Sequence, residues 1–372
     1  MTKRCRVHEG AMTASDSFSY DGDRPGGTVR IRPSLTLLTL VFAGACSAQP
    51  TPLAPLLPPQ VSIAPRTAVD AMLALHHALP SDDLPSPQLR PLPRGLSRTQ
   101  RLLYVSEYRS SSVKIYARKG RGPAIIGTLV RAINHPGSLC FAPDGTLYVP
   151  NEKGATIAVY PFGRSTPSKV LTADKGGPTG CAVDAEGNLW VADFIGHKVY
   201  EFIGGKDKIG AAIEVSCPDS IAFDASGNMY VGLLGFTALG LCSPAHIEVF
   251  APGQTVPFES ITSGLYGEAL LNDIAIGPDG TLYAVAEAGQ TDVLVFPPGR
   301  TIPSRTLAFG DHRVVYLATS TSGRLYAGEN DLAKKPFTYE ITEFPPGARS
   351  PGRWRITQGL RMISGLAAWP AI

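Results

Sequence analysis

The chain has 372 residues, of which 17% are charged, and its formal net charge is +3. A body this close to neutrality lacks the basic surface needed to bind a polyphosphate, so the composition excludes a nucleic-acid-binding protein. Glycine and proline are abundant, at 39 and 33 residues. Glycine supplies positive φ and proline fixes φ in turns, so the composition favours many short strands joined by tight turns.

The first 46 residues are expected to be a leader that contains a signal segment. Residues 34–45 read SLTLLTLVFAGA, an uncharged and mostly apolar run preceded by Arg30 and Arg32. Such a run is too short to span a bilayer as a helix, and it matches the apolar core of a signal peptide. We therefore expect export to the cell envelope or the extracellular space, with membrane contact only through a lipid anchor.

Cys46 directly follows the small residues Ala43, Gly44 and Ala45. This order resembles a bacterial lipobox, in which the cysteine receives a lipid, except that Ala43 stands where leucine is usual. Two alternatives stay open, namely lipidation of Cys46 and ordinary cleavage after Ala45.

Residues 47–100 contain eleven of the prolines and predict a tether. A stretch of this composition favours the extended polyproline conformation and acts as a semi-rigid spacer. We therefore expect this segment to join the leader to a folded body.

From residue 101 onward one strand pattern is repeated six times in the sequence. The segments LLYVSEY, TLYVPNE, NLWVADF, NMYVGLL, TLYAVAE and RLYAGEN recur at intervals of 40 to 53 residues. Each is followed by a second alternating strand, a turn with glycine, and a third strand. Before all but the first lies a fourth strand that ends in a tight-hairpin signal. Four short antiparallel strands at this period predict a β-propeller blade.

The two ends of the repeat region predict how the ring closes. The first repeat begins at Leu102 without an inner strand before it, whereas residues 364–369 form an inner strand without a partner after it. The missing strand and the spare strand complete one blade. We therefore expect an all-β, six-bladed propeller over residues 101–372, closed by pairing of the C-terminal strand with the strand that contains Tyr104.

The repeats follow the pattern PxxIAxDxxGNLYVADxxxxxVxxF, which resembles NHL repeats and the related gluconolactonase-like or regucalcin-like propellers. The resemblance covers residues 102–372 and implies the fold. This superfamily includes scaffolds, ligand binders and lactonases, so the resemblance leaves the function open.

Motifs of the common reaction classes are missing from the sequence. It has no GxSxG elbow, no HExxH, no Walker loop and no Rossmann glycine pattern at a strand-to-helix turn. Propeller geometry instead predicts a site over the central opening, on the face whose loops lead into the inner strands. Two repeats carry insertions on that face, at residues 233–246 and 328–340.

Polar residues gather at two levels of this face, after the repeated aromatic strand and at the start of the inner strands. The candidate ligand-face residues are Glu107, Asn151, Glu152, Asp193, Asp219, Asn272, Asp273, Glu329 and Asn330. A carboxylate after the aromatic strand also has a structural use, because it can accept N–H bonds from the turn that follows. We expect this structural use for Asp193.

The resemblance implies one metal site. The segment CPDSIAFD is similar to the gluconolactonase-like segment whose Asp binds a metal ion, and LNDIAIG is similar to the segment whose Asn binds the same ion. Residue by residue these are Asp219 and Asn272, whose oxygens suit Ca²⁺ or another divalent ion. The acidic ligand of the family's opening strand has no counterpart in residues 95–103. We therefore expect no cofactor, with Ca²⁺ or another divalent ion as the alternative.

Four cysteines fall within the repeats. Cys140 and Cys181 lie in inner strands with an offset of one position, hence on opposite sheet faces, and we expect both to be small buried apolar residues. Cys217 and Cys242 belong to the same face of the same blade. We expect a disulfide between Cys217 and Cys242.

Three functions follow from these observations. The first is a monomeric, non-catalytic binding module whose loop face binds a protein, a glycan or a small ligand. The second is a metal-dependent, lactonase-like hydrolase, and the third is an architectural envelope protein. A bound metal would separate the second function from the other two.

Overall fold

The computed structural model describes residues 87–119, 122–173, 176–235, 242–265, 270–287, 291–309, 313–331 and 338–370. The expected leader, Cys46 and most of the expected tether lie outside the described residues, as do parts of both predicted insertions. Among the described residues no helix is long and apolar enough to cross a membrane. The one helical element in this part of the chain is the short 3₁₀ helix η1 (Ile203–Gly205).

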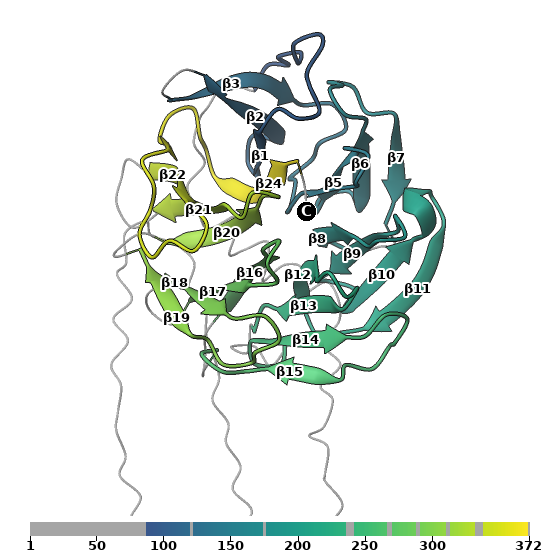
Figure 1. The fold of residues 1–372 in the computed structure, drawn as a ribbon. Coiled ribbons are helices and arrows are strands. Elements are labelled where there is room, and N and C mark those ends of the chain that lie inside the picture. Colours follow the sequence, from purple (N-terminus) through teal and green to yellow (C-terminus); the bar gives the residue numbers. More distant parts are fainter. Residues whose placement is uncertain are drawn as a thin grey trace, which may run out of the picture. The chain divides into compact units, whose positions relative to one another are not determined.

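The described residues form six four-stranded antiparallel sheets arranged in a ring (Figure 1). We number the blades in chain order: blade 1 is β4–β7, blade 2 is β8–β11, blade 3 is β12–β15, blade 4 is β16–β19 and blade 5 is β20–β23. Blade 6 combines β24 with β1–β3. The expected all-β, six-bladed propeller is confirmed.

Each blade places its strands in order from the axis to the rim. The innermost strands are β4 (Cys140–Phe141), β8 (Pro178–Val183), β12 (Pro218–Phe223), β16 (Leu270–Ile276), β20 (Val314–Thr319) and β24 (Ile363–Trp369). The second strands are β5 (Leu147–Asn151), β9 (Leu189–Asp193), β13 (Met229–Leu233), β17 (Leu282–Glu287), β21 (Leu325–Asp331) and β1 (Leu102–Glu107). The third strands are β6 (Thr156–Tyr160), β10 (Lys198–Phe202), β14 (His246–Phe250), β18 (Thr291–Phe296), β22 (Thr338–Phe344) and β2 (Ser112–Lys119). The rim strands are β7 (Lys169–Thr172), β11 (Ile209–Glu214), β15 (Glu259–Ile261), β19 (Arg305–Ala308), β23 (Arg355–Ile356) and β3 (Gly122–Leu129).

The second strand of each blade is apolar at nearly every position because both faces of the sheet are covered. All six residues of β1 and all five of β5 are buried. The side chains on one face of a blade pack against the opposite face of the next blade, and each blade interface forms its own apolar cluster. The hairpins between first and second strands need a residue with positive φ, which Gly187 (84°) and Gly227 (81°) provide.

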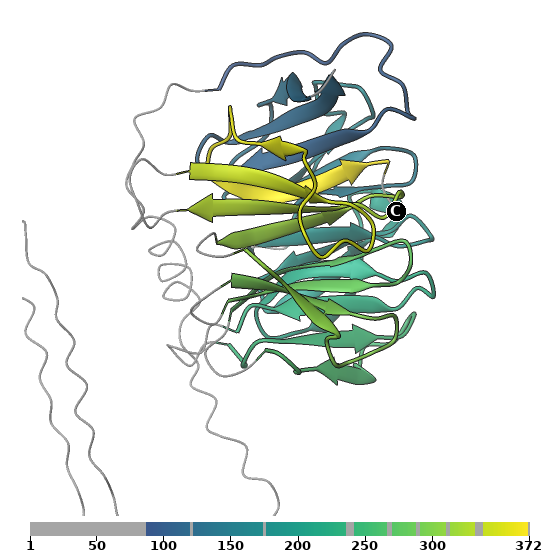
Figure 2. The same cartoon turned by 60° about the vertical axis from the view of Figure 1, so that its left-hand side comes forward.

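The C-terminal strand closes the ring. β24 pairs with β1 in the antiparallel register Leu102↔Trp369 and Tyr104↔Ala367, as the repeat pattern predicts. Figure 2 shows the yellow C-terminal strand lying against the dark blue N-terminal blade. The Trp369 ring packs against Phe141 of blade 1, so the closing strand also contacts the next blade.

The described end of the expected tether lies on the propeller. Arg90 exchanges two backbone hydrogen bonds with Thr128 of β3, at 3.1 and 2.9 Å. Leu92 is buried in the apolar cluster between blades 6 and 1. Trp369 Nε1 donates to the carbonyl of Arg98 at 2.8 Å. Residues 87–100 are therefore part of the folded body.

Cys140 and Cys181 are buried as expected, but the expectation that they are two separate apolar residues is wrong, because they form a disulfide with an S–S distance of 2.04 Å. The offset of one position does place them on opposite faces of their own sheets. Successive blades, however, bring opposite faces together, so a residue on the forward face of blade 1 meets one on the rear face of blade 2. The bond therefore crosslinks two neighbouring blades.

Candidate functional site

A narrow channel runs along the axis between the innermost strands. Its volume is about 180 Å³, and each blade contributes lining residues, such as Ser138, Gly180, Ser220, Asp273, Leu317 and Leu366. Small residues let the strands approach closely at one level. A Cβ on Gly137 would lie 2.2 Å from the Thr179 carbonyl oxygen, and one on Gly180 would lie 2.3 Å from the Asp219 carbonyl oxygen. The channel is therefore constricted near the starts of the inner strands.

Five inner strands carry a β-bulge at this same level. The pairing register shifts across Pro178/Gly180 in β8, Pro218/Ser220 in β12, Leu271/Asp273 in β16, Val314/Tyr316 in β20 and Ile363/Gly365 in β24. A bulge re-aims side chains and locally ends regular pairing. The bulges therefore determine which side chains surround the opening of the channel.

Six polar side chains, one from each blade, gather at this end of the channel, and we call them the axial mouth. They are Tyr108, Glu152, Thr179, Asp219, Asp273 and Tyr316, from blades 6, 1, 2, 3, 4 and 5. Their grouping follows from their mutual interactions: the charges of Asp219, Glu152 and Asp273, together with Tyr108, all raise the pKa of the Tyr316 hydroxyl. Burial is the largest cause of that rise.

Glu152 holds its proton more tightly than an ordinary glutamate. Burial, followed by the nearby charge of Asp219, raises its pKa to about 8, against a smaller lowering by its hydrogen bond with Tyr108. The Tyr108 ring in turn packs edge-on against His135 at a centroid distance of 4.8 Å. At neutral pH the Glu152 carboxyl is therefore mostly protonated.

The carboxyls of Asp219 and Asp273 also have raised pKa values. Burial raises the pKa of Asp219 to about 7, and a hydrogen bond from Thr179 opposes the rise. Burial also raises the pKa of Asp273, which is 4% exposed, and the Asp219 charge adds to the rise. Two backbone N–H groups, from Leu317 at 2.8 Å and Ile274 at 2.9 Å, donate to Asp273 and partly offset it. The charge of Asp219 thus opposes ionisation of both Glu152 and Asp273.

The described contacts lend no support to the divalent ion that the resemblance implies at Asp219 and Asn272. Asn272 Nδ2 donates to Glu287 Oε2 at 3.2 Å, and Glu287 is ion-paired with Arg313 at 2.8 Å. The Asn272 amide nitrogen thus contacts the Glu287–Arg313 ion pair. In the part of the chain that the structure describes, no group of three or more His, Cys, Asp and Glu residues could hold a metal ion.

Other ligand-face candidates contact backbone and side-chain groups of nearby loops. Glu107 is fully buried and accepts hydrogen bonds from the Arg361 N–H and Lys114 Nζ, both at 2.7 Å. Asn151 accepts from the Asn134 N–H at 2.9 Å.

Asp193 accepts hydrogen bonds from the N–H groups of Gly177 at 3.0 Å and Gly196 at 2.7 Å. Asn330 exchanges two hydrogen bonds with the Ile363 backbone, and Glu329 accepts from the Thr342 hydroxyl at 2.7 Å. Like Glu107 and Asn151, these residues hold the loops between successive strands and blades.

The sequence reasoning missed Tyr108, Thr179 and Tyr316 as residues of the mouth. Thr179 has a usable signal, because it follows proline as Asp219 does in the next repeat, and both residues lie in the bulge of their inner strand. Tyr316 follows the bulge in β20, and Tyr108 lies in the β1–β2 turn. These two residues come from repeat positions that differ from each other, so only the folded ring brings them together.

Cys217 and Cys242, the pair expected to bridge, are joined by a disulfide with an S–S distance of 2.04 Å. Cys217 is two residues before Asp219 in the chain. The bond therefore lies beside the axial mouth, at the start of β12.

Comparisons with known proteins agree with this architecture. Residues 114–235 match the model of the SMP-30/gluconolactonase/LRE-like region, a stretch that includes Glu152, Thr179 and Asp219. No curated protein gives a match to the chain.

Two solved structures are similar to the chain. A protein of unknown function from Bacteroides caccae superposes with a TM-score of 0.56 at 13% identity, over 73% of this chain and 100% of that one. Hydrazine synthase from Kuenenia stuttgartiensis superposes with a TM-score of 0.48 at 18% identity, over 60% of this chain and 66% of that one. At these identities the first likeness supports the fold alone, and the second adds no weight. The family match over residues 114–235 and the six-bladed ring together support a likeness to the SMP-30/gluconolactonase-like β-propellers.

Proposed function

We propose that the axial mouth binds a small, uncharged, polyhydroxylated ligand of the kind represented by sugars, and that the protein is a binding module. The observation that carries the proposal is the convergence of polar side chains from all six blades, among which the pKa of Glu152 is raised to about 8 and that of Asp219 to about 7. A ring of such groups on a rigid frame is the usual form of a small-molecule site.

The chemistry of a protonated carboxyl supports a hydroxylated ligand. Neutral Glu152 and Asp219 each offer one O–H donor together with acceptor oxygens, which matches the donor and acceptor character of a ligand hydroxyl. Tyr108 and Tyr316 add aromatic rings with a polar end, suited to a ligand that has both C–H and O–H groups. When the carboxyls ionise, their donors are lost, so binding should weaken as the pH rises through 7 and 8.

A second candidate function is hydrolysis of a lactone. The observation that favours it is the pair of pKa values, about 7 for Asp219 and about 8 for Glu152, because catalytic acids and bases work best with a pKa near the operating pH. Ionised Asp219 would take a proton from the water that attacks the carbonyl carbon. Protonated Glu152 would give its proton to the ring oxygen as the C–O bond breaks.

Calorimetric titration with a panel of neutral mono- and disaccharides at pH 6 and pH 9 tests the proposal. We expect saturable binding at pH 6 that weakens at least about tenfold at pH 9 in the wild type. The Glu152→Gln and Asp219→Asn double variant, whose amides cannot ionise, should bind with little change between the two pH values. Glu186→Gln, at an exposed hairpin on the opposite face, is the matched control and should behave as the wild type.

The outcomes separate binder from enzyme. Turnover of a sugar lactone that the double variant abolishes would favour the hydrolase, whereas binding without turnover supports the binding module. The absence of saturable binding for the whole panel at pH 6 would contradict the binding proposal. A stoichiometric divalent ion lost in Asp219→Ala would show that the mouth is a metal site instead.

Export remains a proposal that rests on residues 34–46, which the structure does not describe. If Cys46 carries a lipid, the Cys46→Ser protein should move from the membrane fraction to the soluble fraction of the producing cells. An unchanged distribution would contradict lipidation, and an unprocessed N-terminus would contradict export.

A further inference from the structure

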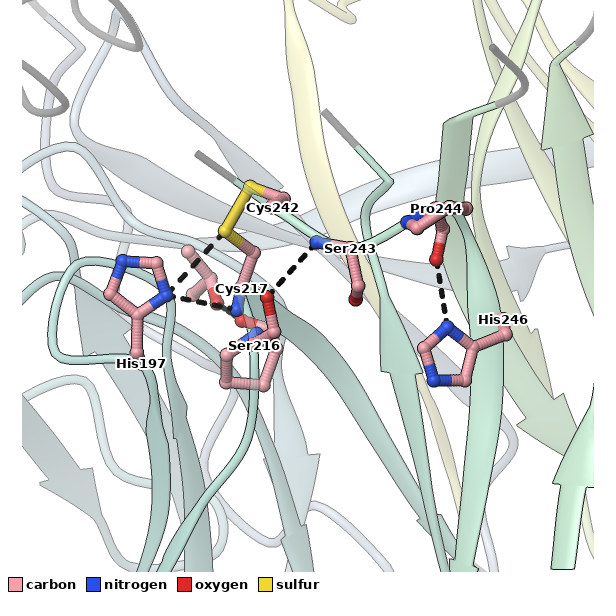
Figure 3. Close-up of a disulfide and its surroundings, with 9 residues drawn as sticks. His197, Ser216, Cys217, Cys242, Ser243, Pro244 and His246 are labelled. Carbon is pink, nitrogen blue, oxygen red and sulfur yellow. Dashed lines mark hydrogen bonds between the residues drawn. A yellow bond between two sulfur atoms is a disulfide. The ribbon is translucent and has the colours of Figure 1, made fainter. Parts of the chain in front are cut away.

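The Cys217–Cys242 disulfide has a histidine from the neighbouring blade beside it (Figure 3). His197 Nδ1 lies 3.6 Å from Cys217 Sγ and accepts the Cys217 N–H at 3.2 Å. His197 and Cys217 both have left-handed backbone conformations, with φ of 51° and 49°. A left-handed conformation is uncommon for residues other than glycine, so the surrounding structure must hold the two residues in this arrangement.

The two sulfurs differ in their access to solvent. Cys217 is 1% exposed, whereas Cys242 is half-buried at the edge of the β13–β14 connection. An incoming thiolate therefore reaches Cys242 more readily, and Cys217 becomes the leaving sulfur. A protonated imidazole beside a cysteine sulfur favours its thiolate form, and a better leaving thiolate departs faster in thiol–disulfide exchange.

The position of this bond links it to the axial mouth. Cys217 precedes Pro218 and Asp219, the first residues of β12. The Cys217 carbonyl accepts the Leu234 N–H at 3.2 Å, and the Leu234 carbonyl accepts the Leu271 N–H at 3.0 Å. Leu271 lies two residues before Asp273. The disulfide thus anchors a chain of backbone hydrogen bonds that leads from one mouth carboxyl toward another.

We propose that Cys217–Cys242 is a thiol-exchange site whose oxidation state controls the position of Asp219 in the axial mouth. The reactant is a dithiol. Its thiolate attacks Cys242 Sγ to form a mixed disulfide, while the Cys217–Cys242 bond breaks and its electron pair goes to Cys217 Sγ. The Cys217 thiolate then takes up a proton from water. The second thiol of the reactant attacks the mixed disulfide, which leaves two protein thiols and an oxidised cyclic reactant.

The chain supplies its own control disulfide. Cys140 and Cys181 are 8% and 6% exposed and lie among the apolar side chains between blades 1 and 2, with Leu189 and Val191 in the same cluster. A thiolate reaches these sulfurs only when the two blades separate. We therefore expect Cys140–Cys181 to resist a dithiol that reduces Cys217–Cys242.

The experiment is timed reduction of the oxidised full-length protein by dithiothreitol without denaturant, followed by alkylation and peptide mass spectrometry. Cys217 and Cys242 should become alkylated at least about tenfold faster than Cys140 and Cys181. In His197→Asn, which tolerates the left-handed conformation but lacks the imidazole, that advantage should shrink severalfold. His246→Asn is the matched control, because the His246 ring contacts the Pro244 carbonyl (Figure 3). It also contacts Glu248.

Each outcome decides the proposal, and none depends on ligand binding at the mouth. Equal rates for the two disulfides, unbridged Cys217 and Cys242 in the oxidised protein, or an unchanged rate in His197→Asn would overturn the exchange site. The link to the mouth is read by amide hydrogen exchange after selective reduction. The Leu234 and Leu271 amides should exchange faster, and unchanged protection of both would overturn the link.

Discussion

The Asp273 carboxylate on β16 accepts the backbone N–H of Leu317 on β20 at 2.8 Å, so a single side chain joins the inner strands of blades 4 and 5. The same carboxylate accepts the N–H of Ile274 at 2.9 Å. Ile274 and Leu317 are both buried. Asp273 therefore has a structural task in addition to its place in the axial mouth.

Replacing Asp273 by alanine should lower the free energy of unfolding by about 2 to 4 kcal/mol, because two buried N–H groups lose their acceptor. Asp273→Asn keeps one acceptor oxygen and should cost clearly less. Urea denaturation measures both effects, with Glu186→Ala at an exposed position as control, for which we expect a change within about 0.5 kcal/mol. Equal stability of Asp273→Ala and the wild type would show that the inter-blade hydrogen bond adds nothing.

The closing strand gives a second prediction. Trp369 is 6% exposed and packs against Phe141 and Phe162 at centroid distances of 5.3 and 5.2 Å. Trp369→Ala should cost about 3 to 5 kcal/mol in thermal unfolding, whereas Ile302→Ala, at a 70% exposed position, should change little. Deleting residues 361–372 removes β24 and exposes the edge of β1, so the truncated protein should melt at a much lower temperature. A truncated protein that melts like the intact one would contradict ring closure by β24.

The disulfide between blades 1 and 2 gives a third prediction. It closes a loop over a sequence separation of 41 residues. In the chain-entropy model such a crosslink stabilises the folded state by about 4 kcal/mol, so the Cys140→Ala and Cys181→Ala double variant should lose up to that amount in urea denaturation. Both proteins are compared with their Cys217–Cys242 disulfide intact. Equal stability of the double variant and the wild type would contradict this prediction.

The raised pKa of Glu152 gives a fourth prediction, on pH and stability. Its pKa is about 8 in the folded protein against an ordinary value of 4.5. Between these values the folded protein keeps a proton that the unfolded chain has released, so raising the pH favours unfolding. The contribution is fully present below pH 4.5 and is lost as the pH rises through 8.

The comparison of the wild type with Glu152→Gln isolates this contribution. The free energy of unfolding of the wild type should fall relative to the variant as the pH rises from 4.5 to 8, by less than about 1.4 kcal/mol per pH unit, and then level off. Thermal unfolding across this pH range measures the difference. A constant difference between the two proteins would mean that Glu152 titrates in the same way in both states.

The repeat pattern was sufficient to predict the blades, and the unmatched strands at its two ends were sufficient to predict the β24–β1 closure. The mouth was harder to predict, because its six side chains come from six blades and from different repeat positions. In β16, for example, the bulge between Leu271 and Asp273 turns Asn272 toward Glu287 and leaves Asp273 at the channel. A one-residue bulge moves the side chains on either side of it to the opposite face of the strand. The composition and spacing of the sequence do not reveal the bulge.

The disulfide between neighbouring blades was also hard to predict from the repeat pattern. The offset between Cys140 and Cys181 was read correctly as two opposite sheet faces, but the stacking of blades brings such faces together. Pairing within one blade, as for Cys217 and Cys242, needs only the local strand order. Pairing between blades needs the direction in which the ring is wound, which the repeat alone does not give.

The proposed sugar site depends on the raised pKa values of Glu152 and Asp219, which let these carboxyls donate hydrogen bonds to a neutral ligand. Titration of ¹³C-labelled carboxyls by NMR, with Glu152 and Asp219 assigned from Glu152→Gln and Asp219→Asn, measures this most directly. We expect midpoints near 8 for Glu152 and near 7 for Asp219, and upward shifts of both when a bound sugar accepts their protons in hydrogen bonds. Midpoints for both carboxyls close to the ordinary 4.5 and 3.8 would contradict this expectation.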